Sequence, residues 1–180
     1  RRSMASLDPA AKLPNVGIVG ATGLVGGMML TMLAERDFPL QSLRLFASKR
    51  SAGTRLPFRG SDIPVEDAAA ADFAGLDLVF FSVGTDASQE IVPHAVRGGA
   101  VVIDKSDAYR LQDGIPLVVA GVNDHVLNGD QIVANPNCSA MQLACVLEPL
   151  RKAAGLARVR LATYQSASGA GDAGPVLRWR

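Results

Sequence analysis

This chain of 180 residues has a formal net charge of +1, which gives no reason to expect nucleic acid or an anionic membrane as a partner. Its 48% hydrophobic and 19% charged residues are ordinary for an α/β domain, and no apolar run approaches the roughly 20 residues of a membrane helix. Cys138 and Cys145 lie about two helical turns apart, too far for a disulfide along a regular helix and without the spacing of a zinc site. We therefore expect free thiols, no metal site and a reducing, cytoplasmic setting, with an organellar origin left open. Residues 1–12 lack the apolar segment of a signal peptide and are left out of the fold prediction.

The first regular element is a short apolar strand over residues 15–20. A glycine-rich turn follows it, and a helix is predicted over residues 28–36. Gly20, Gly23 and Gly26 match a G-x-x-G-x-x-G spacing. Missing side chains there permit a tight turn, approach of backbone N–H groups to a pyrophosphate and close packing of the helix. Its place between strand and helix favours a dinucleotide site, and a glycine-rich turn without a ligand is the alternative.

A second strand, over residues 43–47, is expected to end beside the adenosine ribose of a bound dinucleotide. Folds that prefer NAD place an acidic residue there, whereas residues 48–51 read Ser-Lys-Arg-Ser. Hydroxyl groups and cations suit a 2′-phosphate, so Ser48, Arg50 and Ser51 predict NADP as the cofactor. A solvated basic turn is the alternative.

The middle of the chain continues this alternation. Residues 55–72 look rich in loops, with an edge strand near residues 63–65 and a short alanine-rich helix over residues 68–73. Three further elements are predicted: a buried strand over 76–81, a crossover helix over 87–96 and a strand over 100–104. The pattern predicts an α/β fold with a Rossmann-type, doubly wound parallel sheet.

Ligands of such sheets bind at the carboxyl ends of the strands, so the residues that follow each strand are candidate contacts. We expect Ser82 and Gly84 near the cofactor, and Asp104 with the loop over residues 105–110 to face the same crevice. Arg110 is a candidate clamp for a phosphate or carboxylate, because its guanidinium can donate two parallel hydrogen bonds. A merely solvated arginine is the alternative.

A cysteine stands at the junction between the last predicted strand and a helix. The apolar run over residues 132–134 stops at Asn135-Pro136, and helix formers fill residues 139–147. Pro136 disfavours helical geometry at Asn135, so Cys138 is predicted at or next to the helix N-terminus. The dipole and the unpaired N–H groups there favour a thiolate, which makes Cys138 a candidate nucleophile. A buried structural cysteine is the alternative.

The end of the chain carries weaker signals. Residues 148–149, Glu-Pro, are predicted to bend or end the helix, and residues 156–164 are predicted to return to a strand. The glycine- and serine-rich loop over residues 165–171 is a candidate lining for the pocket of Cys138, with a flexible linker as the alternative.

These motifs together resemble the aspartate-β-semialdehyde dehydrogenase family from about residue 14 to residue 171. The glycine turn is shared widely, but the Asn-Pro-Asn-Cys-Ser run over residues 135–139 and the Tyr-Gln-Ser-Ala-Ser-Gly run over residues 164–169 are specific. The related N-acetyl-γ-glutamyl-phosphate reductases resemble the first half, yet they typically have Pro-Gly-Cys where residues 136–138 read Pro-Asn-Cys.

The resemblance implies an NADP-dependent oxidoreductase of lysine, threonine and methionine biosynthesis. It would convert aspartyl phosphate to aspartate semialdehyde and inorganic phosphate through a thioester on Cys138. Gln165 would position the substrate and Arg110 would hold the phosphate. The implied cofactor contacts are Gly20, Thr22, Gly23, Leu24, Val25, Ser48, Arg50, Ser51, Ser82, Gly84, Ser168 and Gly169.

Family members usually continue for about as many residues again. The resemblance therefore implies a Rossmann NADP-binding domain over residues 13–137 and only the start of an α+β catalytic and dimerisation domain over residues 138–180. In that family, the second half of the protein carries the histidine that acts as general acid and base, an arginine that binds the substrate carboxylate, and most of the homodimer interface. Without the general base the rate should fall by roughly 10²–10⁴. A non-catalytic NADP-binding or partner-binding fragment is the alternative function.

Overall fold

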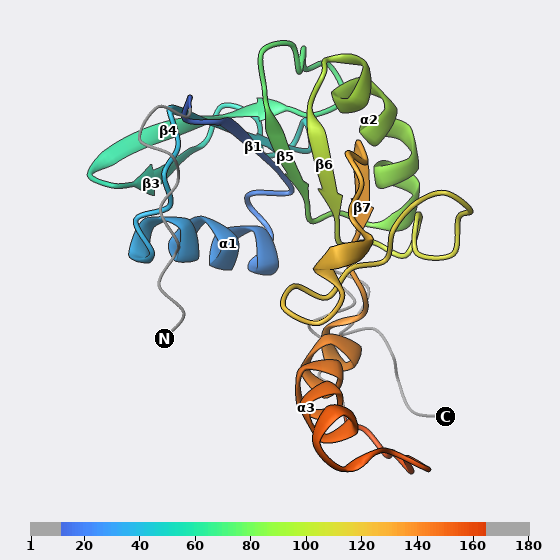
Figure 1. Ribbon diagram of the computed structural model, residues 1–180. Helices are drawn as coiled ribbons and strands as arrows, with labels where there is room; N and C mark the ends of the chain where they lie inside the picture. The colour runs from blue at the N-terminus through green and yellow to red at the C-terminus, as the bar shows by residue number, and fades with distance from the viewer. Residues whose placement is uncertain (1–11, 165–180) are drawn as a thin grey trace, which may run out of the picture.

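The structure is a computed structural model that describes residues 12–164. At its centre is a seven-stranded sheet with the order β3-β4-β2-β1-β5-β6-β7 (Figure 1). Every neighbouring pair of strands is parallel except β3 with β4. The elements in chain order are β1 (Asn15–Val19), α1 (Leu24–Glu35), β2 (Ser42–Ala47), β3 (Arg55–Phe58), β4 (Ser61–Asp67), β5 (Leu78–Phe81), α2 (Thr85–Arg97), β6 (Val101–Asp104), the 3-10 helix η1 (Asp124–Val126), β7 (Ile132–Ala134) and α3 (Cys138–Ala154).

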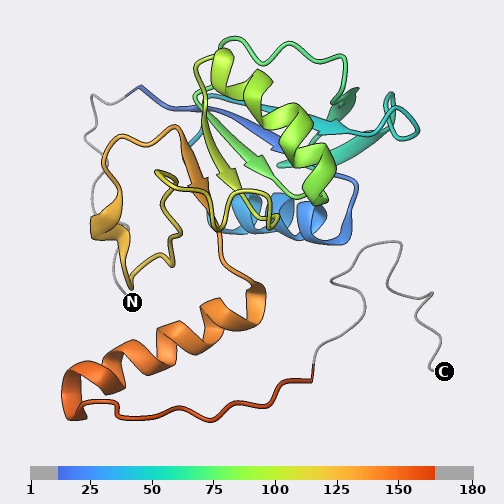
Figure 2. The ribbon, with the colours of Figure 1, turned by 90° about the vertical axis from the view of Figure 1, so that its right-hand side faces the viewer.

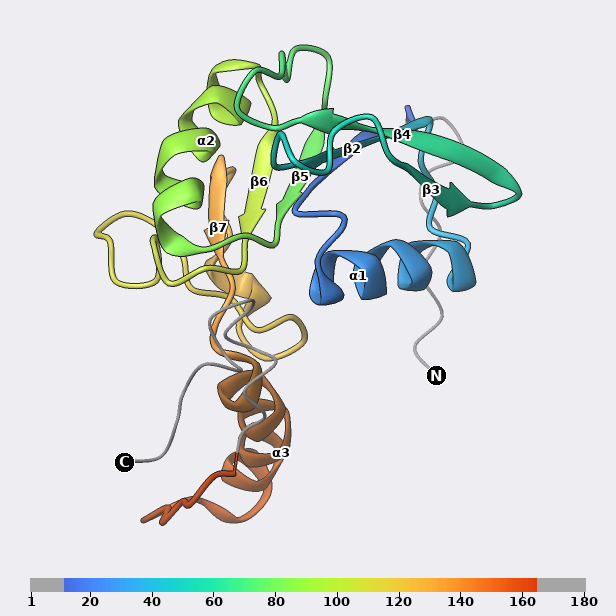
Figure 3. The same cartoon turned by 180° about the vertical axis from the view of Figure 1, so that it is seen from behind.

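Two separate hydrophobic cores lie on the two faces of the sheet. Successive residues of a strand point to opposite faces, and the two cores divide the central strands in that way. Ile18 and Leu45 pack in the core that contains α1. Their neighbours Val19 and Phe46 pack in the core that contains α2. Helices α1 and α2 therefore cover opposite faces, which confirms the predicted doubly wound α/β class (Figure 3).

The segment predicted to be rich in loops is instead a β-hairpin. Strands β3 and β4 are joined by Arg59 and Gly60, both with positive φ, 48° and 80°, as a two-residue hairpin turn requires. Strand β4 pairs with β2 inside the sheet, so the prediction of an edge strand near residues 63–65 was wrong. The edge belongs to β3, where Pro57 can lack its N–H donor without loss of a sheet hydrogen bond.

Three other local predictions were also wrong. Residues 68–73 form turns and coil rather than a helix, because six residues are too short to offset the cost of helix nucleation. Helix α3 continues through Pro149 to its end at Ala154. The carbonyl that loses its partner there belongs to Cys145, an exposed residue, so water can replace the lost donor. Residues 156–164 form no strand, since the described part of the chain offers them no strand to pair with.

Helix α3 extends away from the sheet at the end of β7 (Figure 2). None of its 17 residues is buried, and its apolar side chains Val146 and Leu150 are 60% and 51% exposed. The helix thus has an apolar surface that nothing in residues 12–164 covers. The domain boundary between residues 137 and 138 falls at the first residue of this helix, and it stays a prediction. Across the described range, the helices are too short or too polar to cross a membrane.

Candidate active site

The glycine turn after β1 is fixed by close backbone contacts. Gly20 has a φ of +86°, and a Cβ atom there would lie 2.3 Å from the carbonyl oxygen of Ser82. A Cβ atom on Gly26, inside α1, would lie 2.1 Å from the carbonyl oxygen of Gly20. The N–H groups of Gly20 and Ala21 both donate to the carbonyl oxygen of Phe46, at 2.8 and 3.1 Å. Glycine at positions 20 and 26 is therefore what allows β1, β2, β5 and α1 to meet at one point.

The N-terminus of α1 lies directly after this turn. The helix begins at Leu24, four residues before the predicted start at Met28, because glycines 26 and 27 weaken the helical signal in the sequence. Gly23 is the N-cap residue, and it has no side chain that could accept a hydrogen bond from the first N–H groups of the helix. The first turn carries no acidic side chain. Thr22, Leu24 and Val25 are exposed around it. Backbone N–H groups and the positive end of the helix dipole thus remain available to an anion.

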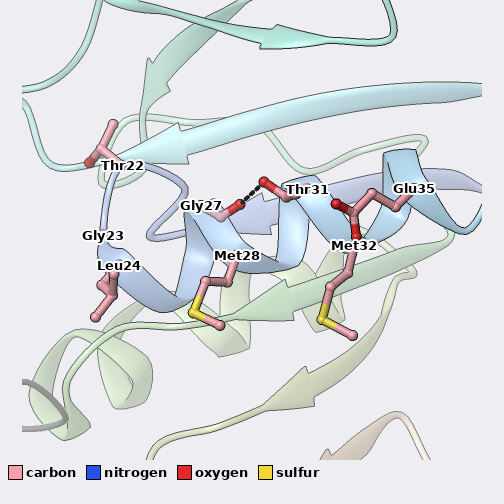
Figure 4. Close-up of a pocket in the computed structure, with 8 residues that line it drawn as sticks. All are labelled: Thr22, Gly23, Leu24, Gly27, Met28, Thr31, Met32 and Glu35. Atoms are coloured by element: carbon pink, nitrogen blue, oxygen red, sulfur yellow. Dashed lines mark hydrogen bonds between the residues drawn. The ribbon is translucent and has the colours of Figure 1, made fainter.

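A hollow of about 570 Å³ follows the exposed side of α1 (Figure 4). It is lined by Thr22, Gly23, Leu24, Gly27, Met28, Thr31, Met32 and Glu35. The side chains of Met28 and Met32 lie on the same side of the helix, and the Thr31 hydroxyl donates to the Gly27 carbonyl at 3.1 Å. Of the residues that line this hollow, only Thr22, Gly23 and Leu24 are predicted cofactor contacts. The hollow therefore continues along α1 beyond the glycine turn.

The turn after β2 carries the predicted contacts to a 2′-phosphate. Strand β2 is the parallel neighbour of β1, so this turn and the glycine turn lie at the same edge of the sheet. Ser48 and Arg50 are exposed and Ser51 is half-buried. Sequence reasoning missed Asp67, which ends β4 in register with Ala47 and so places a carboxylate beside this turn. Only the pairing of β2 with β4 could have revealed it.

The two residues predicted after β5 differ in their surroundings. The N–H group of Ser82 donates to the carbonyl oxygen of Val19 at 2.9 Å. The carbonyl oxygen of Ser82 lies so close to Gly20 that a side chain at position 20 would clash with it. Gly84 caps α2 without a side-chain hydrogen bond, and a Cβ atom there would meet open space. However, Asp86 lies in the first turn of α2, and its negative charge disfavours the binding of an anionic ligand at that N-terminus. The structure therefore brings Ser82 to the glycine turn and leaves α1 as the helix that favours a phosphate.

Asp104 does not face the crevice, so that prediction was wrong. Its side chain is fully buried, and the carboxylate accepts hydrogen bonds from the hydroxyls of Ser88 and Ser106. The Ser106 hydroxyl in turn accepts a hydrogen bond from the N–H of Ala108 at 3.1 Å. A buried carboxylate needs such donors to offset its desolvation, and these donors come from α2 and from the following loop. Asp104 thus holds the loop over residues 105–110 in place.

Arg110 ties the ends of β6 and β7 together. Its Nε donates to the carbonyl oxygen of Asn135 at 3.0 Å, and its Nη2 donates to the carbonyl oxygen of Lys105 at 2.8 Å. Both Arg110 and Lys105 are half-buried. Burial lowers the pKa of Lys105, and the charge of Arg110 lowers it further, whereas Cys138 raises it. Arg110 can therefore bind an anion only through those guanidinium N–H groups that do not donate to the carbonyls of Lys105 and Asn135.

Cys138 is the first residue of α3, as the sequence predicts. Asn137 is the N-cap, and its Oδ1 accepts hydrogen bonds from the N–H and the hydroxyl of Ser139, at 3.0 and 2.6 Å. The Cys138 thiol points toward the same oxygen, with Sγ 3.9 Å from it. The thiol is free and exposed in residues 12–164, as is most of α3. The Oδ1 of Asn135 is buried without a hydrogen-bond partner among the described residues, and such an acceptor is common where a ligand supplies the donor.

The glycine turn, the turn after β2, Ser82, the Lys105–Arg110 loop and Cys138 all follow the carboxyl ends of parallel strands in one sheet. That edge is where open α/β sheets bind ligands. Three predicted site residues, Gln165, Ser168 and Gly169, lie outside the described residues.

Comparison with known proteins gives a consistent family. A profile described as "Semialdehyde dehydrogenase, NAD binding domain" matches residues 15–129. The aspartate-semialdehyde dehydrogenase of Bacillus subtilis (strain 168) is 47% identical over 161 residues, which cover 88% of this chain and 46% of that protein. The enzyme of the same name from Streptomyces akiyoshiensis is 51% identical over 161 residues, with 88% and 46% covered.

Solved structures agree with this result. Aspartate semialdehyde dehydrogenase II of Vibrio cholerae, complexed with ASA, has a TM-score of 0.85 and 41% identity, covering 91% of this chain and 50% of that one. The Candida albicans enzyme with NADP has a TM-score of 0.64 and 28% identity, covering 80% and 48%. The chain thus spans about half the length of the relatives it matches. The chain therefore belongs to the semialdehyde dehydrogenase family and contains its NAD-binding domain, and the relatives and solved structures named above are aspartate-semialdehyde dehydrogenases.

Proposed function

We propose that this chain is the NADP-binding and cysteine-bearing part of an aspartate-semialdehyde dehydrogenase, which converts aspartyl phosphate to aspartate semialdehyde and inorganic phosphate. One observation carries the proposal: the glycine turn after β1 and Cys138 after β7 stand at the carboxyl ends of strands in the same parallel sheet. Three strand spacings separate β1 from β7, or about 14 Å. An extended dinucleotide held at the glycine turn can span such a separation.

The residues at the glycine turn fit a dinucleotide. The absent side chains of Gly20 and Gly26 bring the start of α1 close to the end of β1, and the backbone N–H groups at that start have no side-chain cap from Gly23. Those groups and the helix dipole would hold the pyrophosphate. Ser48, Arg50 and Ser51 would hold the 2′-phosphate of NADP, because hydroxyl groups and a guanidinium are its natural donors. Bound NADPH supplies the reducing equivalent of the reaction.

Cys138 would act as the nucleophile. Its thiolate attacks the acyl carbon of aspartyl phosphate, the C–O bond to phosphate breaks, and a thioester forms on Sγ. After reduction, the same sulfur leaves as the thiolate and the aldehyde is released. Sulfur suits both steps because it is a good nucleophile and a good leaving group. Cys138 is the first residue of α3, and a helix N-terminus is a common position for a nucleophilic cysteine.

Arg110 and Asn135 would line the substrate end of the site. Arg110 is fixed by the carbonyl oxygens of Lys105 and Asn135, so its remaining N–H groups are pre-positioned for the phosphate group. The unpartnered Oδ1 of Asn135 would accept a hydrogen bond from the substrate or from an ordered water. We further propose Gln165 as a substrate-positioning residue, with Ser168 and Gly169 as cofactor contacts. The assembly would be a homodimer in the cytoplasm, where reducing conditions keep the thiol free.

The test is phosphate-dependent formation of NADPH from aspartate semialdehyde and NADP, followed by absorbance. Cys138→Ser is expected to abolish it, because a serine hydroxyl is far less acidic than a thiol. Cys145→Ser is the matched control, since Cys145 is equally free and exposed on the same helix. Activity that survives Cys138→Ser would overturn the catalytic role.

Cofactor binding is measured separately, by the fluorescence of NADPH on titration with the chain. Binding of NADPH without turnover would favour the alternative function, a non-catalytic NADP-binding fragment. A folded chain that binds neither NADPH nor NADH would overturn both functions.

A further inference from the structure

Lys105 and Cys138 follow neighbouring strands at the same edge of the sheet. Strands β6 and β7 pair in register up to Asp104 and Ala134, so Lys105 and Asn135 begin their loops side by side. The N–H of Asn135 donates to the Asp104 carbonyl at 2.8 Å, and Arg110 bridges the carbonyls of Lys105 and Asn135. The position of Lys105 relative to the cysteine turn is therefore fixed by backbone hydrogen bonds.

The ammonium group of Lys105 has no carboxylate to pair with in the described part of the chain. Both acids of its own loop region are engaged elsewhere: Asp104 accepts from two serine hydroxyls, and Asp107 accepts from the hydroxyl of Thr85. A half-buried lysine without an acidic partner is unusual, because its desolvation is not offset.

The Lys105 ammonium has two groups near it that influence its charge, Arg110 and Cys138. Burial and the neighbouring charge of Arg110 both lower the pKa of Lys105, and the opposing influence is that of Cys138. Arg110 cannot substitute for Lys105 as a mobile cation, since its guanidinium is held by two carbonyl oxygens. Lys105 carries a flexible stem with three rotatable donors, which suits a charge that must follow a reacting group.

We propose that Lys105 is a positioning residue that selects anionic electrophiles for Cys138. Its ammonium would face the sulfur in the free chain and would attract the negative charge of an incoming reagent. The preference for anionic electrophiles concerns residues of this chain alone. Its extension to an acyl phosphate as the preferred electrophile rests on the proposed function.

The test compares two alkylating agents of the same size class, anionic iodoacetate and neutral iodoacetamide, in a Cys145→Ser chain. The measured quantity is the ratio of their rate constants at Cys138. Lys105→Met is expected to lower this ratio about three- to tenfold, because one nearby positive charge is lost. Lys105→Arg restores a cation and is expected to retain most of the ratio.

Lys12→Met is the matched control, because Lys12 is an exposed lysine that pairs with Asp77 and its removal changes the net charge equally. It is expected to leave the ratio unchanged. An unchanged ratio in Lys105→Met, or an equal fall in Lys12→Met, would overturn the proposal.

A measurement on the chain with Lys105 intact does not depend on how the variants fold. Raising the ionic strength from about 0.02 to about 1 M shortens the screening length from about 20 Å to about 3 Å, and it is expected to lower the ratio severalfold. A ratio that does not respond to salt overturns the proposal. The proposed function fails on a different result, the absence of NADPH binding, so the two failures are distinguishable.

Discussion

A Cβ atom on Gly26 would lie 2.1 Å from the carbonyl oxygen of Gly20, so any side chain at position 26 forces α1 away from the end of β1. We expect Gly26→Ala to lower the free energy of unfolding by about 3 kcal/mol, because the clash is with backbone atoms that cannot rotate away. It should also weaken NADPH binding, since the N-terminus of α1 moves. Urea unfolding and a fluorescence titration measure the two effects.

The adjacent Gly27 provides the control. A Cβ atom there would come no closer than 4.0 Å to its nearest neighbour, the carbonyl oxygen of Ala21. Gly27→Ala is expected to raise the free energy of unfolding by up to about 1 kcal/mol, because alanine loses less backbone entropy in a helix. Equal stability of the two variants would contradict the packing role of Gly26.

Arg50 is expected to distinguish the two nicotinamide cofactors. Arg50→Ala should raise the Kd for NADPH about tenfold and leave the Kd for NADH unchanged, because only NADPH carries the 2′-phosphate. Fluorescence titrations with both cofactors measure this, and the exposed Lys12→Ala serves as the control for loss of a positive charge. If both cofactors weaken equally, Arg50 does not contact the 2′-phosphate.

Arg110→Lys tests the bridge between the carbonyls of Lys105 and Asn135. A lysine ammonium lacks the planar fork that spans both oxygens, so the free energy of unfolding is expected to fall by about 2 kcal/mol. Arg97→Lys, at an exposed position in α2, should change it little. Equal urea midpoints for the two variants would show that the bridge does not stabilise the fold.

Helix α3 is expected to lose stability in acid through Glu148. Hydrogen bonding from Arg151, followed by the contribution of Lys152, lowers the pKa of Glu148 from 4.5 to about 2. The carboxyl is more acidic in the folded chain, so its contribution is fully present above pH 4.5 and is lost as pH falls toward about 2. The effect is small because the pair is at the surface, and added salt should reduce it.

A pH titration of α3 by circular dichroism, with NMR of the Glu148 side chain, measures this prediction. Glu148→Gln removes the acidic group and should remove its part of the pH dependence. A Glu148 that titrates near 4.5 in the folded chain would contradict the ion pairs with Arg151 and Lys152.

Most of the parallel sheet could be predicted because its strands are continuous apolar runs that are buried on both faces. The β3–β4 hairpin could not, because Pro57, Pro64 and the polar residues between them hide the strand pattern until β2 supplies a partner. The strand predicted over residues 156–164 failed for the converse reason. Its apolar residues fit a strand pattern, but Leu161 and Tyr164 are exposed and have no neighbouring strand in the described chain.

The sequence by itself determined the glycine turn at the start of α1, the basic turn after β2 and the placing of Cys138 at the start of α3. Each depends on the conformational preferences of residues close together in the chain, such as Gly20, Pro136 and Asn137. Only the tertiary structure decided that Asp104 is buried, that Asp67 lies beside Ala47, and that Arg110 holds Asn135, which is 25 residues away. Those relationships follow from strand register and from burial, and no local pattern of residues specifies either.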